Sequence, residues 1–212
     1  MTSSLRRRRG DLGACCAFAL LLAFAAATAA SAQTPTTPPP PAPNSTAFAA
    51  TDTAAFPPAR PADVASMDAI VKALYDVISG PPGQARDWRR FKSLFHPGAR
   101  LIPTGVRPPA QGGGAGARVL TPDDYAQRAA PVLEKEGFFE REVARHTDTY
   151  GNITQLFSTY ESRHAAADPQ PFARGINSIQ LFNDGKRWWV MTIYWDAERP
   201  DNPIPAQFRP KS

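Results

Sequence analysis

Cysteine is nearly absent from this chain, which has only Cys15 and Cys16 among its 212 residues. Both lie in an N-terminal segment that we expect to be removed, so the mature protein would have no disulfide, no thiol nucleophile and no thiolate metal ligand. Histidine is also scarce: the three present, His96, His146 and His164, share no metal-ligand spacing. The sequence therefore predicts no metal site and no cofactor, and a stability that depends on the hydrophobic core alone.

The N-terminal segment has the parts of a secretory signal peptide. Four arginines at 6–9 precede an apolar run from about Ala14 to Ala30, and Ala30-Ser31-Ala32 is a small-x-small cleavage site. We expect cleavage after Ala32 and, because the signal is bacterial in type, a periplasmic or secreted protein exported by the Sec or the twin-arginine route. An uncleaved anchor is the alternative, since a run of about 17 residues is at the lower limit for a membrane span.

Little net charge remains once residues 1–32 are removed. The full chain has 24 Lys and Arg against 19 Asp and Glu, a net charge of +5; the segment takes away four arginines and one aspartate, which leaves 20 against 18, a net charge of +2. This balance predicts no nucleic-acid partner, and loss of the apolar run predicts no stable membrane insertion.

Two further segments follow the signal. Residues 33–61 are mostly Pro, Thr and Ala with almost no charge, which is typical of a disordered, semi-rigid linker. Residues 62–212 are expected to form one domain of about 150 residues, enough to bury about two-thirds of the surface of the unfolded chain.

Hydrophobic periodicity and capping residues predict three helices in this domain. They run from about Asp63 or Ser66 to Ser79, from Asp87 to Phe95, and from Pro122 to about Lys135 with Thr121 as the cap. The glycine-rich stretch 112–116 lacks the Lys-Ser/Thr that follows a phosphate cradle, so we interpret it as a mobile loop over a pocket mouth.

The remaining elements are predicted to be strands: 99–102, 138–148, 153–164, and a hairpin with arms at 174–183 and 186–196. Asp184-Gly185 between two apolar runs predicts a two-residue type I′ turn. Helices followed by consecutive antiparallel strands are typical of an α+β fold. The return strand is apolar on both faces, so both faces need cover.

Three motifs have the order and spacing of a known superfamily. They are Leu94-Phe95-His96-Pro97-Gly98-Ala99-Arg100, Tyr150-Gly151-Asn152-Ile153-Thr154, and Asp184-Gly185-Lys186-Arg187-Trp188 leading to Tyr194-Trp195. From about Met67 to Asp196 the chain resembles the nuclear transport factor 2-like (NTF2-like, SnoaL-like) superfamily and, more distantly, its ketosteroid isomerase branch. The resemblance implies an α+β cone, with about three N-terminal helices packed on a curved, mainly antiparallel sheet, and a homodimer formed through the sheet.

The resemblance also places the catalytic groups of the isomerase branch. Its tyrosine falls on Tyr75, its general-base aspartate near Pro103, and its hydrogen-bonding acid on Ser178 or Asn177, depending on the hairpin register. Because Pro103 cannot take a proton, proton abstraction next to a carbonyl is not supported, and we lean against an enzyme.

The same alignment predicts the strand faces that point into the cavity. The expected ligand-binding residues are Tyr75, Phe157, Thr159, Glu161, Ile176, Ser178, Met191 and Trp195, with Gln180 and Ile193 also facing inward. Leu156, Tyr160, Ile179, Leu181, Trp188, Val190 and Tyr194 would then face outward. A register slip of one residue would reverse any of these strands.

Three residues are candidate catalytic groups: Tyr75, His146 and Glu161. His146, near Asp148, is either a base oriented by a carboxylate or part of a salt-bridged strand face. An inward Glu161 would pair with Arg174, as a ligand anchor, a base or a structural ion pair. His96 is expected in a turn, and His164 at the surface.

Three functions follow from these patterns. The first is an exported protein that binds a small hydrophobic or amphipathic ligand in an apolar pocket. The alternatives are an enzyme of the isomerase, dehydratase or cyclase type in the same pocket, and a protein-interaction module that uses the aromatic sheet face. An inward ionisable group with a perturbed pKa would favour the enzyme. The proline-rich tail is predicted to pack across a sheet through Ile204 and Phe208.

Overall fold

A computed structural model describes residues 56–211, so the predicted signal peptide and most of the predicted linker lie outside the described residues. The elements in chain order are α1 (Pro61–Val64), α2 (Met67–Ile78), α3 (Trp88–Ser93), β1 (Phe95–Val106), the 3-10 turn η2 (Pro109–Gln111), β2 (Ala115–Ala117), α4 (Pro122–Glu136), β3 (Phe139–Tyr150), β4 (Ile153–Arg163), β5 (Ala173–Asn183), β6 (Trp188–Ala197) and η3 (Ala206–Phe208). The predicted α+β class is confirmed. No helix in this part of the chain is long and apolar enough to cross a membrane.

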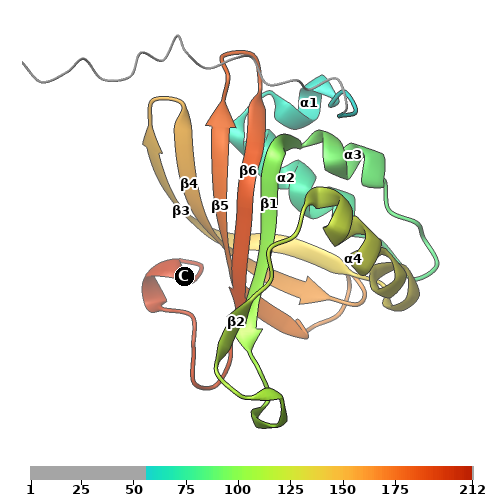
Figure 1. Ribbon diagram of the computed structural model, residues 1–212, viewed down its shortest axis with the longest axis vertical. Coiled ribbons are helices and arrows are strands. Elements are labelled where there is room, and N and C mark those ends of the chain that lie inside the picture. Colours follow the sequence, from blue (N-terminus) through green and yellow to red (C-terminus); the bar gives the residue numbers. More distant parts are fainter. Residues whose placement is uncertain (1–55, 212) are drawn as a thin grey trace, which may run out of the picture. The chain divides into compact units, whose positions relative to one another are not determined.

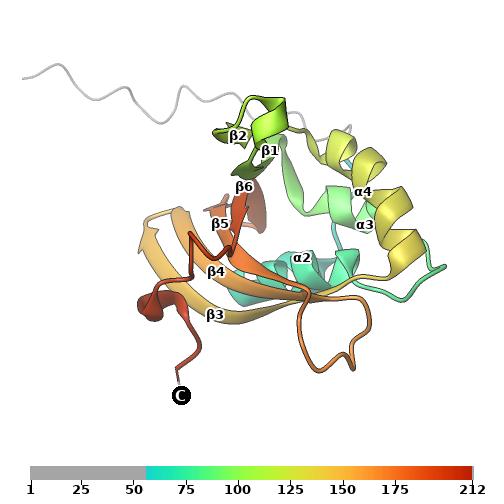
Figure 2. The same cartoon turned by 90° about the horizontal axis from the view of Figure 1, so that it is seen from below.

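The six strands form one open sheet in the order β2-β1-β6-β5-β4-β3. All neighbours are antiparallel except β1 and β6, which are parallel. Seen along its strands, the sheet curves around α2, and α3 and α4 lie on the same side (Figures 1 and 2). The glycine-rich stretch is part of the β1–β2 hairpin, with positive φ angles at Gly112, Gly113 and Gly114.

Capping residues start the helices where the sequence predicts. The Ser66 hydroxyl accepts from the Ala69 N–H at the start of α2, and Asp87 caps α3. Thr121 and Asp124 form a reciprocal capping box at the start of α4. The predicted end of α3 is wrong, because the chain enters β1 at Phe95.

Arg86 joins the ends of two helices. Its side chain is buried, and its guanidinium donates to the carbonyls of Ile78, Gly80 and Leu133 at 2.9, 2.6 and 3.0 Å. A helix leaves its last carbonyls without intrahelical partners. Arg86 satisfies such groups at the C-terminal end of α2 and ties them to α4.

The β5–β6 hairpin is confirmed, but its turn differs from the prediction. The last strand pair is Asn183 with Trp188, so the connection has four residues rather than two. The Asp184 carboxylate accepts from the N–H groups of Lys186 and Arg187, and also from the Trp189 indole at 2.8 Å. The N–H groups of Lys186 and Arg187 therefore bond to the Asp184 side chain instead of to main-chain carbonyls across a two-residue turn.

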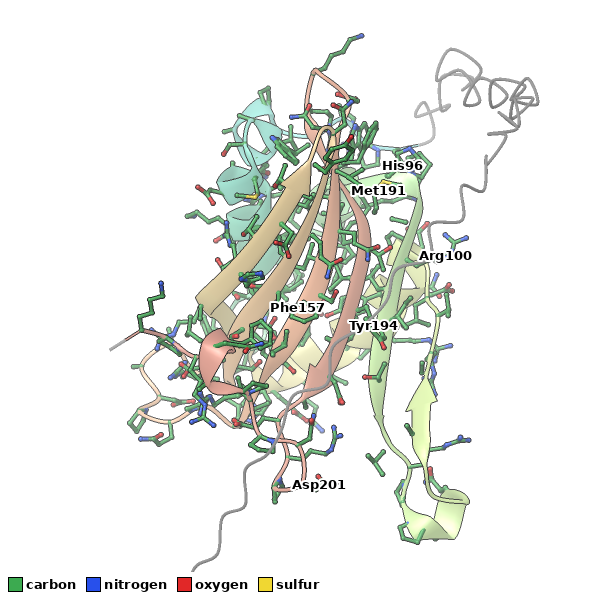
Figure 3. All side chains as sticks on the ribbon, turned by 90° about the vertical axis from the view of Figure 1, so that its left-hand side faces the viewer. His96, Arg100, Phe157, Met191, Tyr194 and Asp201 are labelled. Atoms are coloured by element: carbon green, nitrogen blue, oxygen red, sulfur yellow. The ribbon has the colours of Figure 1, made fainter. Side chains whose placement is uncertain are left out.

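The predicted faces of β4 and β5 are reversed in the structure. Leu156, Ile179 and Leu181 face the helices and are at most 1% exposed. Phe157 and its neighbours at alternate positions therefore lie on the outer face, which Figure 3 shows. The pairing of β6 with β5 is irregular: Leu181 pairs with Val190 and Gln180 with Thr192, so Met191 is an extra residue in β6. As a result, both Val190 and Ile193 point toward the helices.

The C-terminal tail covers part of the outer face, as predicted. Ile204 is only 3% exposed, and the Phe208 ring lies edge-on to Phe157 with ring centres 5.2 Å apart. The Thr159 hydroxyl donates to the Phe208 carbonyl. The tail thus packs on β3 and β4 of its own sheet (Figure 2).

Candidate functional site

An inner cavity of about 230 Å³ lies between the helices and the inward face of the sheet. Its lining is Leu74, Tyr75, Ile78, Phe91, Leu101, Tyr125, Phe138, Glu140, Tyr160, Ser162, Phe172, Ala173, Asn177, Ile179, Ile193 and Trp195. Most of these side chains are aliphatic or aromatic, and the polar ones gather around a single carboxylate. An apolar wall with a few convergent polar groups is the usual composition of a small-molecule pocket.

The carboxylate is that of Glu140, at the start of β3. Ser162 donates to Oε2 at 2.8 Å and Asn177 to Oε1 at 3.4 Å. Among the described residues no Lys or Arg forms an ion pair with Glu140. Burial raises the pKa of Glu140 to about 7, although the hydrogen bonds from Ser162 and Asn177 lower it. Near neutral pH this group therefore exchanges between a carboxylic acid, which donates, and a carboxylate, which accepts a proton.

Tyr75 enters the same cavity from α2, and its proton is already committed. Its hydroxyl lies 2.6 Å from Ser158 Oγ, and Ser158 donates to Glu142 Oε1. Since Ser158 has one proton, its oxygen must accept from Tyr75. Asn177 donates to the Tyr75 hydroxyl at 3.1 Å, and burial raises the pKa of Tyr75. Tyr75 is thus a fixed acceptor at the edge of the cavity rather than an acid.

Glu142, two residues along β3, differs from Glu140 because it has a cationic partner. Arg145 donates to both of its carboxylate oxygens, at 2.8 and 2.6 Å, and also to Asp68. Both carboxylate oxygens of Glu142 are thus occupied by the Arg145 guanidinium. Two glutamates on the same strand face therefore differ in chemistry through the presence or absence of one arginine.

Two further tyrosines supply donors. Neither the Tyr125 hydroxyl nor the Tyr160 hydroxyl bonds to a described residue, while both side chains line the cavity. Burial and the nearby Glu140 raise the pKa of each phenol, so both stay protonated. Gly175 leaves room for Tyr160, because a Cβ there would lie 2.5 Å from the phenol oxygen.

The ligand-binding residues predicted from the sequence do not share one cavity. Tyr75 and Trp195 line the inner cavity. Phe157, Ile176 and Ser178 instead line a space of about 300 Å³ under the tail, on the outer face. This placement corrects the inward orientation predicted for them.

The other predicted positions also lie away from the inner cavity. Thr159 is fully buried beneath the tail. Met191 lies at the β6 irregularity and lines an outer groove with Tyr150 and Phe182. Figure 3 shows Met191, Tyr194 and Phe157 on the outer side of the sheet.

The candidate acids and bases outside the cavity have structural roles. Glu161 faces outward and accepts from Arg163 at 2.9 Å and Arg141 at 3.0 Å. Burial raises its pKa, but these hydrogen bonds outweigh burial and the pKa is lowered overall. Arg174 lies 3.8 Å from Glu161, so the ion-pair interpretation holds. Glu161 does not reach the cavity.

The histidines are likewise remote from the inner cavity. His146 is exposed, lies 3.3 Å from Asp148, and contacts Phe208 edge-on. His96 is expected in a turn but lies in the irregular first part of β1, where it accepts from the Gly98 N–H; His164 stacks on Phe172 at the surface, as predicted. None of the three lines the space around Glu140.

Sequence reasoning misses Glu140 because its local pattern is ordinary. Phe139-Glu140-Arg141-Glu142 alternates as a solvated edge strand would. The available signal is the alternation itself: Glu140 and Glu142 must share one face, and that face is the one α2 covers. Asn177 is one of the two positions, with Ser178, at which the resemblance places a hydrogen-bonding group, depending on the hairpin register.

No model of a known protein family matches the chain, and no curated protein matches its sequence. Among residues 56–211, no three His, Cys, Asp or Glu side chains are grouped as metal ligands would be. The site is therefore interpreted from its own residues.

Proposed function

We propose that the domain binds a small amphipathic molecule in the inner cavity, with its apolar part against Ile179, Ile193 and Trp195 and a polar group on Glu140. The observation that carries this proposal is the cavity itself, apolar except for one hydrogen-bonded cluster. The phenols of Tyr125 and Tyr160 offer donors beside the carboxylate, so a hydroxyl or carbonyl on the ligand finds both a donor and an acceptor.

We propose further that the fold is of the NTF2-like type and that the protein is exported. Helices on the concave side of a curved, mainly antiparallel sheet support the first proposal. The second is supported by residues 1–32, which contain a cluster of arginines, an apolar run and a small-x-small cleavage site.

A pair of neighbouring substitutions tests the binding proposal. Ile193 lines the cavity, and Thr192 is its neighbour in β6 on the outer face. Ile193→Trp should fill the cavity, and Thr192→Trp adds the same side chain outside it. Native mass spectrometry of the protein purified from its own source should reveal a bound small molecule in the wild type and in Thr192→Trp.

The probe 1-octanol provides a second measurement by titration calorimetry. We expect binding to the wild type and to Thr192→Trp, and none to Ile193→Trp. Equal binding by all three proteins would place the ligand elsewhere and contradict the proposal.

The pKa of Glu140 favours a second function, proton transfer to or from the bound molecule. A general acid or base works best when its pKa is near the working pH. Glu140 lies beside Tyr125 and Tyr160, which are positioned to stabilise a developing oxyanion. The sequence places no base at Pro103, but β3 supplies a carboxylate to the same cavity.

Deuterium exchange tests this second function. Small ketones and enones are incubated with the protein in D2O, and exchange at carbons next to the carbonyl is followed by NMR. The exchange rate should rise with pH with an apparent pKa of about 7, and exchange should be lost in Glu140→Gln. Glu142→Gln is the control: it keeps the Glu140 carboxylate, so any change in rate that it causes comes from altered structure and not from loss of the base. Exchange that is equal in the wild type and Glu140→Gln would contradict the assignment.

A further inference from the structure

A groove with three arginines opens beside the inner cavity. It lies between the β1–β2 hairpin and α4 and has a volume of about 900 Å³. Tyr125 and Trp195 line both the groove and the inner cavity, with ring centres 6.1 Å apart. These two rings therefore form a wall that the groove and the inner cavity share.

The arginines come from three different segments and no acidic residue lines the groove with them. Arg107 follows β1, Arg118 follows β2, and Arg128 lies on α4. In residues 56–211 none of the three has a carboxylate within ion-pair distance, whereas other arginines of the domain bind carboxylates at 2.6 to 3.0 Å. Asp124, one turn before Arg128, is bound to Thr121 in the capping box. The groove is thus locally basic in a domain of nearly balanced charge.

Arg107 is held against the groove wall. Its Nη2 donates to the Ala115 carbonyl at 3.3 Å. The Arg107 Nε would lie 3.4 Å from a Cβ at Gly116, so the guanidinium lies in contact with β2. The remaining N–H groups of Arg107 can bind an anion without a large change of position.

The groove also has apolar edges. Val106 on the hairpin and Val132 on α4 are 53% and 52% exposed. Pockets for drug-sized ligands are typically about 300–1,000 Å³, which is larger than the inner cavity alone. A ligand of that size needs space outside the inner cavity, and the groove, which shares Tyr125 and Trp195 with the cavity, is one adjoining space.

We propose that the groove binds the anionic head of the amphipathic ligand, a carboxylate or a phosphate monoester, while its apolar part passes Tyr125 and Trp195 into the inner cavity. This inference rests on the proposed binding function and names its ligand class. Guanidinium groups bind carboxylate and phosphate oxygens through paired N–H donors. Three of them around one groove select for a negative head group and against a positive one.

Titration calorimetry with four eight-carbon probes tests the charge preference. The probes are octanoate, octyl phosphate, 1-octanol and octylammonium chloride. At low salt we expect the preferred anion to bind about tenfold tighter than 1-octanol, octylammonium to bind more weakly, and the preference to shrink at high salt. The ratio of octanoate to octyl phosphate affinity identifies the head group.

Two triple variants locate the preference. Arg107→Gln/Arg118→Gln/Arg128→Gln should bind the anions no tighter than 1-octanol, with 1-octanol binding unchanged. The control Arg89→Gln/Lys186→Gln/Lys211→Gln changes exposed residues outside the groove and lowers the net charge equally. It should keep the preference for anions.

The outcomes separate this inference from the binding proposal. If 1-octanol binds the wild type and not Ile193→Trp, but the anions bind no tighter than 1-octanol, the basic groove is not a head-group site and the cavity proposal stands. If the control variant loses the preference as the groove variant does, net charge explains it and the inference is wrong. If no probe binds the wild type, both proposals fail.

Discussion

Replacing Glu140 with glutamine should make the domain more stable at neutral pH and above and leave its stability near pH 4 unchanged. Glutamine keeps the shape of the side chain. Its amide oxygen can accept from Asn177 and its amide nitrogen can donate to the Ser162 hydroxyl. The substitution therefore removes the ionisable proton and little else from the cluster.

The sign follows from the direction of the shift. The pKa of Glu140 is raised from 4.5 to about 7 in the folded protein, so between these values the folded state binds more protons than the unfolded state. Stability then falls as pH rises through this window. At 1.36 kcal/mol per pKa unit, the wild type loses about 3 kcal/mol between about pH 4.5 and pH 7. Glu140→Gln lacks this loss.

Urea unfolding followed by tryptophan fluorescence, at intervals from pH 4 to pH 8, measures the effect. The difference in unfolding free energy between Glu140→Gln and the wild type should be near zero at pH 4 and reach about 3 kcal/mol by pH 8. Titrations of other groups cancel in this difference, because both proteins share them.

Glu161→Gln is the matched control with the opposite sign. The pKa of Glu161 is lowered, since the hydrogen bonds from Arg163 and Arg141 outweigh burial. This carboxylate stabilises the fold above its unfolded pKa, and the contribution is lost as pH falls. Glu161→Gln should therefore destabilise the domain at pH 7 and not at low pH. If the Glu140→Gln and wild-type curves run parallel from pH 4 to pH 8, Glu140 has the same pKa in the folded and the unfolded protein, and the reasoning about the site is wrong.

Two further predictions concern elements that hold the site in place. Arg86→Ala removes three hydrogen bonds to buried main-chain carbonyls, of which that of Gly80 keeps the Phe138 N–H as a donor, and should cost about 3 kcal/mol in urea unfolding, while Arg89→Ala, on an exposed residue, should change stability by less than about 0.5 kcal/mol. A chain ending at Pro200 loses Ile204 from its buried position and should bind more hydrophobic dye and aggregate, whereas a chain ending at Arg209 should behave as the full protein does; equal dye binding by both would mean that the tail is not a cover.

The helices are largely predictable from sequence because their determinants are local. Ser66, Asp87 and Thr121 each accept a hydrogen bond from an N–H three residues later. Such a contact is set by residue type and spacing, so it can be recognised without knowing the fold. The hairpin between β5 and β6 is recognised for the same reason, although the Asp184 carboxylate lengthens its turn.

The strand faces are not predictable in the same way. In β4 both faces carry large apolar residues, Leu156 on one and Phe157 on the other. Alternation alone leaves the choice open, because either face can be buried. The helices take the face of Leu156, and the tail covers Phe157 through Phe208, a contact across about fifty residues of sequence.

The sequence by itself determined the α+β class, the helix starts, the β5–β6 hairpin and the packing of the tail, since each depends on neighbouring residues or on the demand that apolar surface be covered. Only the tertiary structure decided that Glu140 is a half-buried carboxylate with a pKa of about 7 while Glu142 is an ion-paired one. The physical reason is that a pKa depends on burial and on the charges nearby in space. Arg145 reaches Glu142 and does not pair with Glu140, and no pattern within β3 distinguishes the two.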